Sequence, residues 1–236
     1  MLDLLWHPSR ADVIAVTLSD GAVALCQSSG ADGSGLWSEG RTCTVTTTEC
    51  ASHSLEPWTL AFGPPGAAGL LFSGGDDAVL QALRLSSAID GIPSGCSKDD
   101  DNNDEDNEDD EQTLATQLWT DRKVHQAGVT SILPLASELL VTGSYDDRIR
   151  LLYAPALGRR RVLAELDLGG GVWRLKMLGG DKGYVIFFSF LSAFFPSLLF
   201  RFNWSWFCFP SLPHVVPSPD AVRRVWHSSL RHGDVT

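Results

Sequence analysis

The residues best suited to chemistry in this 236-residue chain are its six histidines, its carboxylates and its five cysteines. Hydrolysis would need a nucleophile or an activated water, together with donors that stabilise an oxyanion. The sequence contains neither a Gly-x-Ser-x-Gly nucleophile elbow nor a His-Glu metal motif. Because no segment brings such groups together, we assign no catalytic residue, no metal ligand and no cofactor from the sequence.

The cysteines lack the spacing of a zinc site or a disulfide framework. They stand at positions 26, 43, 50, 96 and 208, without a Cys-x-x-Cys pair. The N-terminus lacks the basic start, apolar run and small-residue cleavage site of a signal peptide. These features predict a reducing, cytoplasmic location.

Three aspartates, Asp20, Asp77 and Asp146, stand in similar surroundings. Each is followed by an aliphatic residue three positions on and by an apolar residue or Cys six positions on. A proline lies 12 or 13 residues upstream of each, at the end of an apolar segment. This repeat predicts strand, loop, strand, tight turn and strand, with the Asp in the turn. Its carboxylate can accept hydrogen bonds there from backbone N–H groups two residues on.

Antiparallel sheets repeated along a chain are typical of a β-propeller, so the sequence predicts an all-β fold. We expect strands near residues 2–6, 12–17, 22–26, 58–62, 69–73, 78–84, 129–133, 138–142 and 148–153. The spacings between the turn aspartates, 57 and 69 residues, exceed the roughly 40–45 residues of one blade. We therefore expect insertions between blades over 27–54 and 86–112.

The second insertion holds an acidic run over 97–111, which accounts for the net charge of −11. Ten carboxylates lie between Asp99 and Glu111, which leaves 19 acidic against 18 basic residues elsewhere. Such a run cannot bury enough apolar surface to offset the ordering of its backbone, so we expect a disordered loop. Docking of a basic partner is the alternative. The densest basic cluster, Arg159–Arg161, fits a solvated loop, and we expect no nucleic-acid partner.

The third copy, Thr142-Gly-Ser-Tyr-Asp146, resembles the WD40 repeat, although Leu152-Tyr153 stands where that repeat ends in Trp-Asp. In WD40 domains a His upstream of the turn Asp often bonds it. His53 and His125 lie 24 and 21 residues before Asp77 and Asp146. The resemblance implies buried structural roles for both; a surface loop and catalysis are the alternatives.

The next segment looks like the start of a fourth blade. Its distinctive residues are Gly170, Gly171, Val172, Trp173, Arg174 and Lys176. Together with the preceding turn they resemble the WD40-repeat diphthine methylesterase family of diphthamide biosynthesis. The resemblance covers about residues 1–178 and departs at Met177-Leu178, where the family continues with Trp.

The resemblance implies an incomplete propeller of about three blades over 1–178. It implies removal of the methyl ester from diphthine methyl ester on translation elongation factor two. The competing function is a non-catalytic scaffold that binds other proteins through the propeller faces.

The tail over 179–236 changes in character: nine of the eleven phenylalanines lie between Tyr184 and Phe209. Tyr184–Phe200 carries no charge over 17 residues, but Pro196 interrupts it, so we do not expect a membrane helix. A pair of core strands is another alternative, although apolar and polar residues do not alternate.

A retained intron explains this tail best, because Phe, Ser, Leu and Pro fill 13 of the 14 positions 187–200. Pyrimidine-rich codons specify these residues, and Gly183-Tyr-Val185 can be encoded by an intron-donor sequence. We therefore expect an irregular aromatic-rich tail. Open sheet edges would leave the chain as written inactive and without a cooperative thermal transition.

Overall fold

The computed structural model describes residues 2–30, 43–64, 67, 69–86, 89, 114–178, 184–191 and 202–208. Within these residues, fifteen strands form four antiparallel sheets. Within each sheet, every strand pairs with the next strand along the chain, so each sheet is an up-and-down meander. This is the construction of a propeller blade.

The first sheet contains β1 (Leu4–Trp6), β2 (Val13–Thr17), β3 (Ala22–Gly30) and β4 (Cys43–Ser52). The second contains β5 (Pro57–Phe62), β6 (Leu70–Gly75), β7 (Leu80–Leu85) and β8 (Ala115–Asp121). The third contains β9 (Val129–Ala136), β10 (Leu139–Ser144), β11 (Arg148–Tyr153) and β12 (Arg161–Asp167). The fourth contains β13 (Gly170–Leu178), β14 (Tyr184–Leu191) and β15 (Phe202–Cys208).

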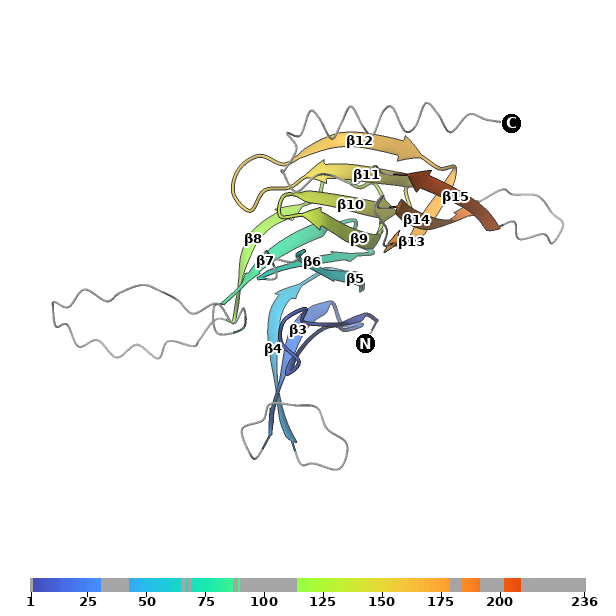
Figure 1. Cartoon of the computed structure of the whole chain (residues 1–236). Coiled ribbons are helices and arrows are strands. Elements are labelled where there is room, and N and C mark those ends of the chain that lie inside the picture. Colours follow the sequence, from blue (N-terminus) through green and yellow to red (C-terminus); the bar gives the residue numbers. More distant parts are fainter. Residues whose placement is uncertain are drawn as a thin grey trace.

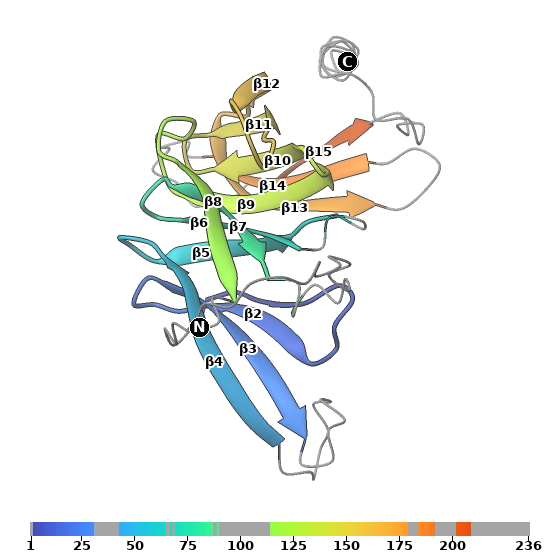
Figure 2. The same cartoon turned by 90° about the vertical axis from the view of Figure 1, so that its left-hand side faces the viewer.

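The sheets follow one another through the molecule in sequence order (Figures 1 and 2). The first strand of each sheet packs beside the first strand of the next, so β1, β5, β9 and β13 lie at the inner edge. The prediction of an incomplete WD40-type propeller is therefore confirmed, with three four-stranded blades and a three-stranded sheet.

All the predicted strands are present, but the outer strands β4, β8 and β12 were missed. The first of them corrects the prediction of an insertion over 27–54, because Cys43–Ser52 pairs with β3. Its side chains at 44–47 are exposed, so this part shows little apolar alternation to mark a strand. Backbone hydrogen bonds and β-branched residues hold it. The acidic run 97–111 lies outside the described residues.

The backbone of the tail also differs from the irregular structure we expected. β14 pairs with β13 in a register that places Lys176 opposite Ile186, and β15 pairs with β14. Aromatic and β-branched residues favour extended backbone, and pairing uses the backbone whatever the side-chain alternation. In the described part of the chain, no helix is long and apolar enough to cross a membrane. The intron origin of the tail stays a prediction.

The hydrophobic core lies between neighbouring blades. Val129 and Ile132 of β9 pack with Phe72 and Trp119 of the second sheet. A Cβ atom on Gly74 would lie 2.7 Å from Cγ1 of Val129, and Gly143 meets Val172 of the next blade in the same way. Glycine on the second strand therefore lets an inner-strand valine of the next blade pack directly on the backbone.

The residue after each turn Asp has a positive φ. The angles are 102° at Gly21, 58° at Ala78 and 65° at Asp147. Each turn thus has a residue with positive φ at this position, and only the first copy has glycine there. A side chain in this left-handed region is strained.

We expect Ala78→Gly to stabilise the protein by about 1 kcal/mol, because it removes the Cβ strain at φ 58°. The free energy of unfolding in urea measures the effect. Ala51→Gly, within strand β4, is the matched control and should destabilise by about 0.5–1 kcal/mol. Equal loss of stability in both variants would show that Ala78 carries no strain.

Candidate functional site

The three turn aspartates make the same local hydrogen bond. In each turn the backbone N–H two residues on donates to the carboxylate. The pairs are Ala22 to Asp20 at 3.1 Å, Val79 to Asp77 at 3.1 Å and Arg148 to Asp146 at 3.2 Å. The carboxylate therefore closes the turn between the second and third strands of each blade.

In the second blade, Asp77 also holds a histidine. His53 lies beyond β4, and its Nδ1 is 3.0 Å from Oδ1 of Asp77. Its Nε2 is 2.9 Å from Oγ of Ser73 on β6. The backbone N–H of Ser54 donates to Asp77 at 3.0 Å. These bonds tie the segment after β4 to the middle of the sheet.

The order of groups Ser73, His53 and Asp77 matches the hydrogen-bond pattern of a Ser-His-Asp triad. The side chain of His53 and the residue Ser73 are both 0% exposed. A nucleophile must reach its substrate, and no substrate reaches Ser73 through this packing. The triad pattern here therefore serves structure rather than hydrolysis.

Hydrogen bonds keep the pKa of Asp77 below its ordinary value despite burial. Burial acts to raise its pKa, but the bonds from His53, Ser54 and Val79 outweigh burial and lower the pKa below the ordinary value of 3.8. Since the folded pKa is lowered, this stabilisation is present above about pH 3.8 and is lost as pH falls through the folded pKa.

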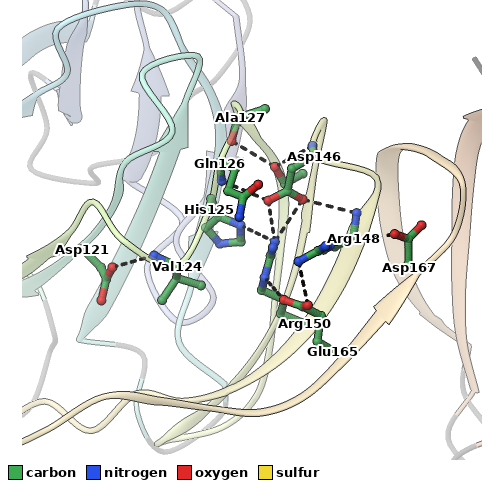
Figure 3. Close-up of polar contacts among 11 residues, drawn as sticks. Asp121, Val124, His125, Gln126, Ala127, Asp146, Arg148, Arg150, Glu165 and Asp167 are labelled. Atoms are coloured by element: carbon green, nitrogen blue, oxygen red, sulfur yellow. Dashed lines mark hydrogen bonds and ion pairs between the residues drawn. The ribbon is translucent and has the colours of Figure 1, made fainter.

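In the third blade an arginine lies between the His and the Asp (Figure 3). Nη1 of Arg150 lies 3.0 Å from Oδ1 of Asp146 and 3.1 Å from Nδ1 of His125. Its Nε donates to Glu165 at 2.7 Å. Arg150 is only 1% exposed, so these partners neutralise a buried cation. The backbone N–H of Gln126 donates to Asp146, as Ser54 does to Asp77.

Two buried polar atoms lie beside this arginine network without hydrogen bonds among the described residues. His125 Nε2 and Thr142 Oγ1 have no hydrogen-bond partner among the described residues. They occupy the positions of His53 and Ser73, which do bond. Because Arg150 donates to Nδ1, His125 is neutral with its proton on Nε2. Burial, reinforced by the charge of Arg150, lowers the pKa of His125 to about 4.

The first blade has only the turn bond. Asp20 is exposed, and the histidine upstream of it, His7, has its Nδ1 3.3 Å from Oγ of Ser9 instead. The carboxylate of Asp20 accepts the backbone N–H of Ala22, which closes the turn. The structure therefore brings His53 to Asp77 directly and His125 to Asp146 through Arg150.

The inner strands line a cavity of about 840 Å³. Trp173, Arg174 and Lys176 of β13 face it, together with Asp3 of the first blade. Gly170 and Gly171 begin the same strand, and Val172 is buried against Gly143. Within the described residues, no group of three or more His, Cys, Asp or Glu side chains could hold a metal ion.

Sequence reasoning missed Ser73 and Arg150. Ser73 stands four residues before its turn Asp, and Arg150 stands four residues after its own. The available signal for Arg150 was a single cation between Ile149 and Leu151, in a strand whose central residues are buried. A charge in that place needs partners, which the tertiary structure supplies.

No protein-family model matches the chain. A diphthine methyltransferase of Schizosaccharomyces pombe is 28% identical over 186 residues, which are 78% of this chain and 44% of that protein. The Saccharomyces cerevisiae protein of the same name is 30% identical over 52% of this chain and 29% of its own length. The chain combines a WD40-type propeller fold with sequence similarity to these diphthine methyltransferases.

The chain spans less than half the length of these diphthine methyltransferases. The mouse protein is 31% identical over 53% of this chain and 20% of its own length. Among solved structures, the chain is similar to the WD40 propeller domain of Doa1, with 15% identity and a TM-score of 0.46. That match covers 78% of this chain and 47% of the other.

We expect Asp77→Ala to destabilise the protein by about 2–4 kcal/mol, because His53 and two backbone N–H groups lose their acceptor. Urea unfolding measures the loss. Asp20→Ala is the matched control, since the exposed Asp20 holds only its own turn, and it should cost about 1 kcal/mol. Equal costs at the two turns would contradict a special role for the His53 bond.

We expect the free energy of unfolding to fall as pH is lowered from 6.5 to about 4, because of His125. Because its folded pKa is lowered, the unfolded chain binds more protons there, so stability falls as pH falls. His125→Gln keeps an acceptor for Arg150 but does not titrate. The stability of the parent relative to this variant should therefore decline across the window. Imidazole resonances of His125 that titrate near pH 6.5 would contradict the lowered pKa.

Proposed function

We propose that this protein acts in diphthamide biosynthesis, by hydrolysing the methyl ester of diphthine methyl ester on translation elongation factor two. The observation that carries the proposal is the sequence shared with the S. pombe diphthine methyltransferase over 186 residues. That match is long enough to include more than one blade. A cytoplasmic location belongs to the same proposal.

We choose hydrolysis because the segment from Gly170 to Lys176 resembles the methylesterase family. The name of the relatives describes methyl transfer instead. In the proposed hydrolysis, water adds to the ester carbonyl carbon and the bond from that carbon to the methoxy oxygen breaks. Methanol leaves, and the product is a carboxylate with release of a proton. A transferase would instead need a methyl donor.

The cavity at the inner strands supports binding of such a product. Arg174 and Lys176 line it from one strand, and both side chains are exposed. Two cations beside a newly formed carboxylate favour the hydrolysed product electrostatically. We assign no catalytic residue to the step.

The second candidate is a non-catalytic scaffold that binds other proteins through the propeller faces. The full burial of Ser73 and of the His53 side chain favours it, because the one Ser-His-Asp arrangement among the described residues is closed to substrate. Propellers serve many functions, so the fold does not choose between the candidates.

Incubation of the 236-residue chain with methyl-esterified elongation factor two separates them. If the chain hydrolyses the ester, mass spectrometry should show the loss of one methyl group, with methanol as the second product. That outcome would overturn the expectation that open sheet edges leave the chain as written inactive. A variant with Arg174→Ala and Lys176→Ala should act more slowly, while Arg159→Ala, in a loop, serves as the charge control. Stable binding without a mass change would support the scaffold, and a methyl gain that needs a donor would support transfer.

A further inference from the structure

Three aromatic side chains from three successive sheets meet beside the cavity. Trp58 lies on β5, Tyr145 follows β10 and Trp173 lies on β13. The rings of Trp58 and Tyr145 stand 5.2 Å apart at 85°, and those of Tyr145 and Trp173 stand 5.6 Å apart at 53°. Tyr145 therefore lies between the two tryptophans, and all three residues line the same cavity.

The rings are held in place but remain open to solvent. Tyr145 is 37% exposed and Trp173 is 51% exposed. A Cβ atom on Gly171 would lie 2.7 Å from Cδ1 of Tyr145, and one on Gly128 would lie 2.7 Å from Cζ3 of Trp58. Glycine at the start of each following blade thus lets the ring lie against the backbone, which fixes the angle between the walls.

Two carboxylates accompany the aromatic walls. Glu56 accepts a long hydrogen bond of 3.5 Å from Nε1 of Trp58. Asp76 lies beside the Trp58 ring, since both border the position of a Gly128 Cβ atom. Burial and then the charge of Asp76 raise the pKa of Tyr145. The aromatic side of the cavity is therefore electronegative.

We propose that Trp58, Tyr145 and Trp173 form a binding site for a quaternary ammonium group. Such a group has no N–H donors, so hydrogen-bond acceptors cannot hold it, whereas aromatic faces attract its diffuse positive charge. Rings at large angles to one another offer several faces to one rounded cation. Glu56 and Asp76 add attraction at longer range without direct contact.

The opposite charge on the neighbouring strand narrows the ligand class. Arg174 and Lys176 line the same cavity and would repel an isolated cation, but they suit a carboxyl group close to it. The site therefore fits a betaine-type group, in which a trimethylammonium lies beside a carboxylate or its ester. For the ester part of this ligand the inference rests on the proposed function.

The test measures binding to the full chain, without any enzymatic assay. Choline and glycine betaine are titrated while the indole N–H resonances are followed by NMR, and the uncharged tert-butyl isostere of choline is the control ligand. Trp173→Ala should weaken binding about tenfold, and Trp173→Phe should restore most of it. Trp6→Ala is the matched variant, because Trp6 is 54% exposed and lies outside the cavity lining.

Saturable binding of choline with little binding of the isostere supports the site, and tighter binding of betaine supports the role of Arg174 and Lys176. Equal binding of choline and its isostere would overturn the proposal, as would equal losses in Trp6→Ala and Trp173→Ala. Failure to bind either ammonium ligand by a chain that removes the methyl ester would overturn this site and leave the proposed function standing. Binding of the ammonium ligands by a chain that does not remove the methyl ester would support this site and contradict the proposed function.

Discussion

The carboxylate of the turn Asp, which accepts a backbone N–H two residues on, is the contact on which each blade depends. It closes the hairpin between the second and third strands at a residue with positive φ. In the second and third blades the other carboxylate oxygen, Oδ2, accepts a backbone N–H from the segment that leads into the blade, from Ser54 and Gln126 respectively. One short side chain thus joins a local turn to a distant part of the chain, which sets where the inner strand begins.

The three blades differ in the buried polar side chains that surround the turn Asp. The first blade uses an exposed Asp20, and the second adds His53, whose buried side chain bonds Asp77. The third inserts Arg150, which compensates Asp146 and Glu165 but takes the Nδ1 atom of the histidine. A buried arginine is tolerated because its donors find acceptors, whereas His125 Nε2 and Thr142 Oγ1 have no hydrogen-bond partner among the described residues.

The positions of the inner strands decide which side chains can meet a ligand. Glycines on the second strands let valines of the next blade pack closely, and this spacing brings residues of three blades to one cavity. Trp58, Tyr145 and Trp173 are far apart in sequence and touch only because the blades are adjacent. The turn of the third blade therefore serves both features. Asp146 belongs to the buried polar network, and Tyr145, directly before it, lines the open cavity.

The sequence by itself determined the repeat, because hairpin strands and their turns are local: an apolar run, a proline and a turn Asp recur at short range. The residues from Gly170 to Lys176 also indicated the resemblance to the diphthine methylesterase family. The sequence did not predict β4, whose exposed side chains carry little apolar alternation and whose pairing uses backbone atoms. Only the tertiary structure decided that Arg150 separates His125 from Asp146 and that Ser73 is buried. Contacts between residues far apart in the chain depend on blade packing, which no local pattern encodes.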